Sequence, residues 1–189
     1  MVNECSKCKD AFSYNIGYKG KNADKHKIML VLHRSDSRAL EPTLFNDYEN
    51  ALFTSQTGKI LCDMLDYCWS SHEDVLITNF VKCLFPEDRF PKKKEYENCL
   101  RNLEKQVEEF QPKKIIAFGT YVCQHMFPEC KNISEKVGEI IPYKKIPTYL
   151  SYHPAFIWKM RTRDQVKHYE SINSFLNQFK EKEIIKGNK

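Results

Sequence analysis

Four continuous apolar runs, each bounded by polar or turn-forming residues, are the strongest constraint on how this chain of 189 residues folds. A continuous apolar run is typical of a strand that is covered on both faces, whereas a half-exposed strand alternates apolar and polar residues. We therefore expect four buried strands. They correspond to IMLVLH at 28–33, DVLITNFV at 74–81, KKIIAFG at 113–119 and IPTYLSYHP at 146–154.

Segments with helical periodicity separate these runs and follow the last one. Amphipathic helices are expected from Gly58 (GKILCDMLDYCW), Glu95 (EYENCLRNLEKQVEEF) and Thr120 (TYVCQHMF), and over the C-terminal DQVKHYESINSFLNQFKEK. Strands that alternate with helices predict an α/β fold with a central four-stranded, mainly parallel sheet flanked by helices on both faces. The length favours a single domain over 1–189, with a flexible basic tail at 181–189.

In sheets of this kind, the chemistry lies beyond the carboxyl ends of the strands. The segments expected there are His33 to Asp36, Thr78 to Cys83, Gly119 to Tyr121, and His153-Pro154.

Charge and composition limit the compartment and the partners. The N-terminal MVNECSKCKDAF lacks the apolar run of a signal peptide, and no segment approaches the roughly 18 uninterrupted apolar residues of a membrane span. We expect a soluble, cytoplasmic monomer that does not bind membranes. The net charge of +5 and lysine clusters at 92–94, 113–114 and 144–145 favour a polyanionic partner, although such clusters are also typical of solvated surfaces.

Eight cysteines in a reducing compartment favour metal binding over disulfides. Cys5 and Cys8 form a C-x-x-C pair, and Cys83 and Cys99 bracket a loop that contains two prolines and a lysine run. Four thiolates fit either a tetrahedral zinc site or a four-iron cluster by ligand count. The alternative is that these are small core side chains, which is the role expected of Cys62, Cys68 and Cys123 on apolar helix faces.

A set of motifs occurs in a characteristic order along the chain: C-x-x-C at 5–8, LFTSQTGKIL at 52–61, T-N-F-V-K-C at 78–83, Arg89-Phe90-Pro91, Glu95, Cys99, QPKKIIAFG at 111–119 and His153-Pro154-Ala155. This order resembles that of the family 4 uracil-DNA glycosylases, the iron–sulfur branch of that superfamily. The resemblance implies a uracil-DNA glycosylase-like fold and a [4Fe-4S] cluster on Cys5, Cys8, Cys83 and Cys99.

The resemblance also implies an activity and the roles of particular residues. The expected protein is a DNA glycosylase that hydrolyses the N-glycosidic bond of uracil, or of a related modified base, flipped out of single- or double-stranded DNA. Phe53 would stack on the base, Asn79 would match its pairing edge, and His153 would donate to the departing anion. Phe53 could instead be a core residue, and His153 could merely cap a turn. Lys92, Lys93 and Lys94 would contact DNA.

The first motif departs from the family pattern. The family has Gly-Glu-Gly/Ala-Pro-Gly after the first strand, whereas this chain has LHRSDSRALEP at 32–42, with His33 in place of the glutamate. Asp36 or Glu41 could supply the carboxylate that positions water, or His33 could act as the base. A catalytically degenerate member that binds DNA or a protein is therefore the alternative function.

Overall fold

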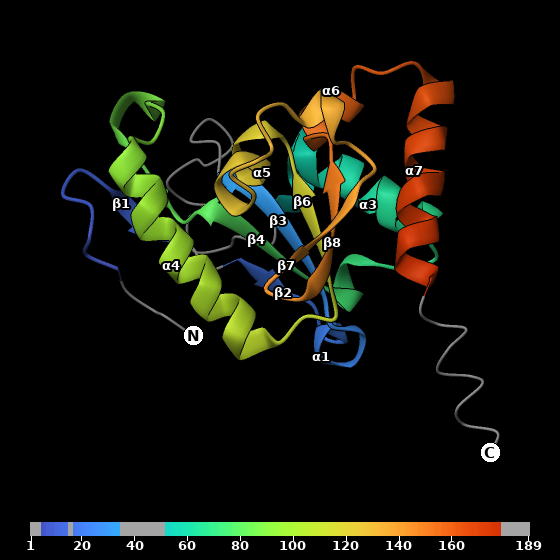
Figure 1. The fold of residues 1–189 in the computed structure, drawn as a ribbon, viewed down its shortest axis with the longest axis horizontal. Helices are drawn as coiled ribbons and strands as arrows, with labels where there is room; N and C mark the ends of the chain where they lie inside the picture. Colours follow the sequence, from blue (N-terminus) through green and yellow to red (C-terminus); the bar gives the residue numbers. More distant parts are fainter. Residues whose placement is uncertain (1–4, 15–16, 35–51, 179–189) are drawn as a thin grey trace.

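A mixed sheet of six strands forms the centre of the computed structural model, which describes residues 5–14, 17–34 and 52–178 (Figure 1). The strand order is β2-β4-β3-β6-β8-β7; the four inner strands are parallel, and each edge strand is antiparallel to its neighbour. The strands are β2 (Tyr18–Lys19), β3 (Ile28–Arg34), β4 (Val75–Val81), β6 (Lys114–Phe118), β7 (Ile140–Tyr143) and β8 (Ile146–Ser151).

The predicted α/β class and all four predicted buried strands are confirmed as β3, β4, β6 and β8. The predicted strand number was too low, because the sheet also has two edge strands. β2 has only two residues, and β7 is a four-residue segment that contains Pro142 and is mostly exposed, so neither has the pattern of a buried strand. Proline lacks a backbone N–H and is tolerated at sheet edges, as here.

Helices cover both faces of the sheet, and each face has its own core. Met29 and Val31 pack on one face with α4 (Lys93–Phe110) and α5 (Thr120–Met126). Leu30 and Leu32 point to the opposite face, where α3 (Gln56–Tyr67) and α7 (Thr162–Asn177) cover them. Figure 1 shows these two layers on either side of the sheet. Burial on both faces explains why the inner strands are continuously apolar.

Shorter elements connect these layers. Among the helices of the described segments, none is long and apolar enough to cross a membrane. The predicted tail at 181–189 lies outside the described residues. The short elements are α1 (Ala23–His26), η3 (His72–Asp74), η4 (Pro86–Asp88), η5 (Ile133–Glu135), α6 (Pro154–Ile157) and the antiparallel pair β1 (Phe12–Tyr14) and β5 (Cys83–Leu84).

Candidate active site

The carboxyl ends of the four parallel strands lie at one edge of the sheet, and three of the predicted site residues lie there. His33 lies at the end of β3, Asn79 lies beside it near the end of β4, and His153 follows β8. Leu32 pairs with Asn79, so His33 and Asn79 lie at nearly the same level. Asp36 and Glu41 lie outside the described residues.

Burial and the turn that follows β8 together determine the protonation of His153. Its Nδ1 accepts a hydrogen bond from the backbone N–H of Ala155 at 3.2 Å, so it caps the short helix α6. Burial lowers the pKa of His153 to about 4, which leaves the imidazole neutral at pH 7 with its single proton on Nε2. The capping role and the predicted donor role are therefore compatible, because they use different ring nitrogens.

Gly119 allows His153 to approach the end of β6. A Cβ atom at position 119 would lie 3.1 Å from the Cβ of His153, and the backbone there has a φ of +86°. The N–H of Gly119 also donates to the carbonyl of Ser151 at 2.8 Å, which joins the β6 and β8 ends. A side chain at this position would both strain the backbone and push the histidine away.

Asn79 and Phe53 belong to the face of the sheet that α3 covers. Asn79 is buried, with 4% of its surface exposed, and by strand alternation it lies on the same side as Ile77, a member of the α3 core. Phe53 is partly buried against that core; its ring centroid lies 5.1 Å from that of Tyr18 and 4.5 Å from that of His72. Phe53 thus has the packing partners of a core residue, and one of them, His72, precedes β4 on the amino side of the sheet.

His33 faces the opposite side of the sheet and is enclosed by aromatic rings. It stacks on Tyr121 with centroids 4.7 Å apart, and its Nε2 forms a 2.8 Å hydrogen bond with the hydroxyl of Tyr96. Burial, followed by the nearby charge of Arg34, lowers the pKa of His33 to about 3. The imidazole is therefore neutral at pH 7 and a weak base, which disfavours it as an activator of water.

Three exposed aromatic residues in this part of the molecule, Phe90, Tyr121 and Trp158, had no individual role predicted from the sequence. Phe90 contacts Tyr121 with centroids 5.5 Å apart, and the guanidinium of Arg34 lies over the Phe90 ring. Phe90 and Tyr121 remain 56% and 45% exposed, and Trp158, just after α6, is 56% exposed. For Tyr121 the available signal was its position just after β6, since loops at this edge line the site in such sheets, whereas Phe90 and Trp158 follow short helices further along the chain.

An ion pair between Arg89 and Glu95, six residues apart in the sequence, fixes the 83–99 loop. Arg89 forms two hydrogen bonds with the carboxylate of Glu95, at 2.9 and 2.8 Å, and its guanidinium lies over the Phe85 ring. The same carboxylate accepts the backbone N–H of Lys92 at 2.6 Å at the start of α4. This arrangement places the exposed Lys92, Lys93 and Lys94 beside Phe90 at the carboxyl edge.

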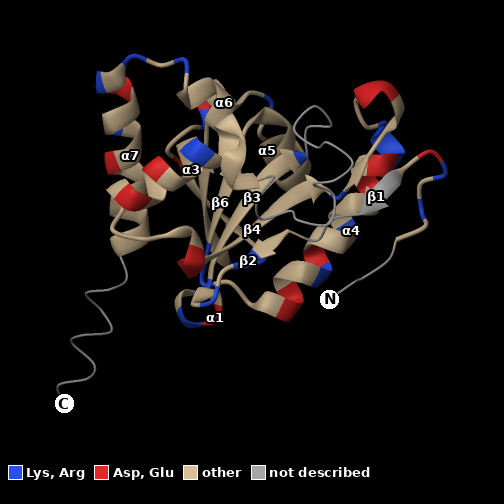
Figure 2. Ribbon diagram, turned by 180° about the vertical axis from the view of Figure 1, so that it is seen from behind, with Lys and Arg blue, Asp and Glu red and all other residues tan. Residues whose placement is uncertain are grey.

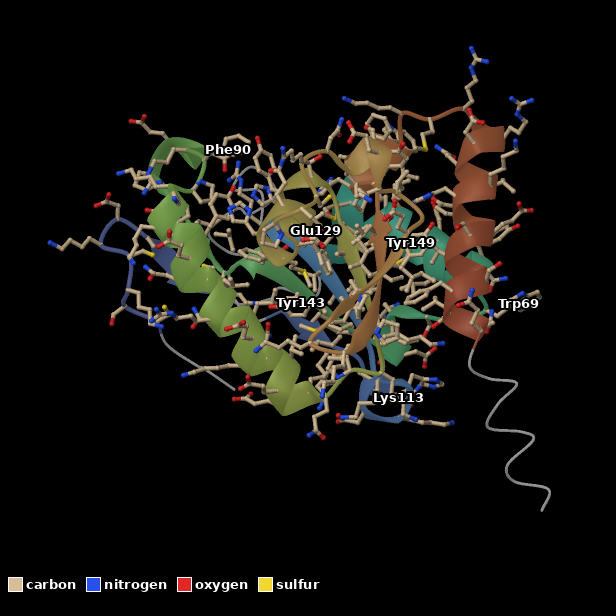
Figure 3. All side chains as sticks on the ribbon, viewed as in Figure 1. Trp69, Phe90, Lys113, Glu129, Tyr143 and Tyr149 are labelled. Carbon is tan, nitrogen blue, oxygen red and sulfur yellow. The ribbon has the colours of Figure 1, made fainter. Side chains whose placement is uncertain are left out.

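The lysines at 113–114 lie away from the carboxyl edge of the sheet. Lys113 and Phe90 occupy opposite ends of the molecule (Figure 3), because Lys113 precedes β6 at the amino edge of the sheet. Lys114 is buried and donates to the carbonyl of Leu176. The interpretation of this cluster as part of the polyanion-binding surface was therefore wrong for Lys114, whose ammonium group cannot reach a phosphate from the core.

The predicted cluster ligands come together around the first half of α4. Cys99 is on α4, Cys83 begins β5, and the strand pairing of β1 with β5 brings in the N-terminal segment that carries Cys5 and Cys8. Side-chain amides on α4 donate to two of the sulfurs: Asn102 to Cys5 at 3.5 Å, and Asn98 to Cys8 at 3.6 Å. Of the other cysteines, Cys68 and Cys123 are buried as predicted, whereas Cys62 is only partly buried.

The four thiols are close enough to affect one another. Burial raises the pKa of the Cys83 thiol to about 12, and Cys99, Cys5 and Cys8 also act to raise it. Within the described ranges, no three His, Cys, Asp or Glu side chains are grouped as they would be around one metal ion. Four thiols that affect one another, two of which accept hydrogen bonds from side-chain amides, have the ligand type and number that an iron–sulfur cluster requires.

A buried lysine lies directly beside this cysteine group. Lys82 has 3% of its surface exposed, and its ammonium group donates to Oε1 of Gln106 at 2.5 Å and to the Thr78 hydroxyl. Burial lowers the pKa of Lys82 to about 7, whereas the Cys99 and Cys83 sulfurs act in the opposite direction.

Comparison with known proteins finds one matching family and several curated relatives. The model of the Uracil DNA glycosylase superfamily matches residues 39–177. The Type-4 uracil-DNA glycosylase of Saccharolobus solfataricus is 29% identical over 163 residues, covering 82% of this chain and 72% of that protein. The Type-4 uracil-DNA glycosylase of Archaeoglobus fulgidus is 32% identical over 134 residues, covering 66% of each chain. That of Pyrobaculum aerophilum is 26% identical over 165 residues, covering 83% and 81%.

Proposed function

Because this chain belongs to the uracil-DNA glycosylase superfamily, we propose that it is a DNA glycosylase that hydrolyses the N-glycosidic bond of uracil, or of a related modified base, flipped out of DNA. The observation that carries the proposal is that Asn79, near the end of β4, and a neutral His153, just after β8, both lie at the carboxyl edge of the sheet. The names of its relatives support the same activity. We further propose that it acts as a monomer on single- or double-stranded DNA inside the cell.

The proposed mechanism assigns one task to each side chain. The extruded base stacks on Phe53, and the amide of Asn79, which has both a donor and an acceptor, pairs with the edge of the base. As the glycosidic bond breaks, negative charge develops on the base, and the Nε2 proton of His153 donates to it. A neutral imidazole is already in the donating form at pH 7, so no preceding protonation is required.

The attacking water needs a second group, and this is where the first motif is altered. We propose Asp36 as the carboxylate that positions the water, with His33 as the alternative base. The low pKa of His33 and its hydrogen bond with Tyr96 support a carboxylate, Asp36 or alternatively Glu41, over His33 in this role. In this proposal His33 forms part of an aromatic wall with Tyr121.

Excision of uracil from labelled oligonucleotides, single- and double-stranded, tests this proposal. Wild type should produce abasic sites, and His153→Ala and Asn79→Ala should each be slower by about a hundredfold or more. His26→Ala, at the amino edge of the sheet, is the matched control and should be as fast as wild type. Asp36→Asn should be strongly impaired and His33→Phe much less so; the reverse order would transfer the base role to His33.

If wild type yields no abasic product in either strand context, uracil excision is wrong, and modified pyrimidines are the next substrates. DNA binding without excision of any base would favour the degenerate, binding-only alternative.

We also propose that Cys5, Cys8, Cys83 and Cys99 hold a [4Fe-4S] cluster. When bound, the cluster would join the N-terminal segment, β5 and α4 into one rigid unit and so fix the 83–99 loop. The protein should be brown and contain about four irons per chain. Cys99→Ala should lose the iron, whereas Cys130→Ala, which alters a buried cysteine away from this group, should keep it. A colourless protein that contains zinc and no iron would contradict the assignment.

A further inference from the structure

Two exposed aromatic side chains lie next to each other at the carboxyl edge, on the side of the sheet that His33 faces. Phe90 and Tyr121 are both roughly half exposed, and their ring centroids are 5.5 Å apart. The Phe90 ring also lies 6.1 Å from the His33 ring, which places it beside the end of β3. Adjacent aromatic rings left in water forgo the stabilisation that burial would give, so this pair is suited to being covered by a partner.

Tyr121 is held in place by the rings packed against it. It stacks on His33 with an interplanar angle of 17°, and His33 forms a 2.8 Å hydrogen bond with the hydroxyl of Tyr96. Tyr96 stacks on His125 with centroids 4.0 Å apart, and Nδ1 of His125 donates to the carbonyl of Tyr121 at 2.7 Å, one turn earlier on α5. The Tyr121 ring is therefore ordered before a partner arrives, which lowers the entropic cost of binding.

Phe90 is positioned by a charged pair from two other segments. The guanidinium of Arg34, at the end of β3, lies 5.1 Å from the Phe90 ring centroid. Asp88 fixes that guanidinium by accepting hydrogen bonds at its carboxylate, at 2.5 Å, and at its carbonyl, at 3.4 Å. A fixed cation over the ring restricts how the ring can move and leaves about half of the residue exposed to a second planar group.

The residues that follow Phe90 indicate which partner this pair fits. Pro91 comes next, and then the three exposed lysines at 92–94. Proteins that bind single-stranded nucleic acids combine aromatic rings, on which bases stack, with cations that neutralise the phosphates. An apolar peptide could also cover the rings, but it would gain nothing from three adjacent cations. The combination of rings and lysines therefore favours a nucleic acid strand.

We propose that Phe90 and Tyr121 form a second base-stacking site, which takes an unpaired nucleobase flanking the extruded nucleotide and gives the protein a preference for single-stranded over duplex DNA. The inference rests on the proposed function, because the extruded nucleotide occupies the part of this edge that carries Asn79 and His153. In a duplex, neighbouring bases cover both faces of each base, and unstacking a base costs free energy. A base in a single strand avoids most of that cost, so the two rings stabilise the single-stranded complex more.

Binding of oligonucleotides that contain no uracil tests this site separately from excision. Phe90→Ala and Tyr121→Ala should each weaken the affinity for a single strand by about tenfold, the scale of one lost contact between a base and an aromatic ring, and should weaken duplex affinity much less. Phe90→Leu keeps an apolar side chain without the ring and should bind like Phe90→Ala, whereas Phe90→Trp should restore binding. A fluorescent base analogue that is quenched by stacking should be quenched less by the alanine variants.

Trp69→Ala is the matched control. Trp69 is 88% exposed, and it lies at the opposite side of the molecule from Phe90 (Figure 3). The variant removes an exposed aromatic ring of similar character from a place that the proposed strand does not reach. It should keep the wild-type affinity for both single-stranded and duplex DNA.

A wild-type affinity for single strands in both Phe90→Ala and Tyr121→Ala would overturn the proposal, whether or not the protein excises uracil. A loss confined to duplex DNA would also overturn it, because Phe90 would then act as a wedge between base pairs. Conversely, if these variants lose affinity for single strands but the wild type excises no base, the proposed activity is refuted and the stacking site remains.

Discussion

At the carboxyl edge, local hydrogen bonds determine which ring nitrogen of each histidine remains available. His153 accepts the N–H of Ala155 with Nδ1, so its proton must be on Nε2. His33 also becomes neutral by burial, but its Nε2 is engaged by the Tyr96 hydroxyl. Two histidines at the same edge, both kept neutral by desolvation, are thus suited to different tasks. The family resemblance predicted where these residues lie in the sequence, but only the contacts distinguish their roles.

A third buried histidine predicts how stability depends on pH. Burial lowers the pKa of His168, on α7, to about 4, and its Nε2 forms a 2.9 Å hydrogen bond with the Ser151 hydroxyl. As pH falls, the unfolded chain binds this proton near its ordinary pKa of about 6.5, whereas the folded chain resists protonation until about pH 4. Stability is therefore complete above about pH 6.5 and is lost progressively as the pH falls to about 4.

Chemical denaturation at pH 7 and pH 5 measures this effect. The free energy of unfolding should fall between these values, and His168→Gln, which can still bond Ser151 but does not titrate, should show a smaller fall. The control is His72→Gln, because His72 is partly exposed on the short helix η3. Equal pH sensitivity in wild type and His168→Gln would show that other groups control the acid transition.

At the scale of elements, the conformation of the 83–99 loop depends on contacts between the loop and the first turn of α4. The carboxylate of Glu95 accepts two hydrogen bonds from Arg89 and one from the backbone of Lys92, so one residue fixes both the loop and the first turn of the helix. The Arg89 guanidinium, and secondarily the Lys92 N–H, lower the pKa of Glu95 below its ordinary value despite burial. The carboxylate is ionised at neutral pH, and its contribution is lost only as the solution becomes acidic.

Glu95→Gln should therefore destabilise the loop by about 2 kcal/mol, the scale of a charge-assisted hydrogen bond. Amide hydrogen exchange across residues 86–93 should be faster in the variant, and proteolytic cleavage there should increase. The control is Glu97→Gln, two residues along α4, whose exposed pair with Lys94 should contribute little. Unchanged exchange in Glu95→Gln would mean that other contacts hold this loop.

For the whole molecule, the sequence predicted the strands that are buried along their whole length. It did not predict the features that depend on how strands and helices are arranged in the fold. The four inner strands are apolar throughout, so their positions could be predicted. The two-residue β2 and the exposed β7 leave no such pattern, and the sheet was expected to have four strands instead of six. Likewise, the strand at 113–119 was expected, but the adjacent lysines do not reveal that the side chain of Lys114 is buried. The aromatic group around His33 joins β3, α4 and α5, which only the fold brings together.

The distribution of charge over the whole molecule limits where DNA can bind. Beyond the first turn of α4, acidic and basic side chains alternate along the helix (Figure 2), so this stretch has no uniformly basic face. Lys92, Lys93 and Lys94 differ, because they are exposed beside the aromatic carboxyl edge, where an extruded base would enter. We therefore expect phosphates to contact this turn and not the amino edge of the sheet.

Charge reversal at these two places tests that expectation. Lys93→Glu should weaken DNA binding equally for all base sequences, because interactions with phosphates carry no sequence information. It should also reduce the salt dependence of duplex affinity, by about 0.9 in the slope of log K against log salt for each phosphate that the variant no longer neutralises. Lys113→Glu makes the same change of charge at the opposite end of the molecule and should leave both quantities nearly unchanged. Equal reductions in the two variants would indicate that net charge alone attracts DNA, and an affinity insensitive to salt would exclude a phosphate-binding role for the 92–94 lysines.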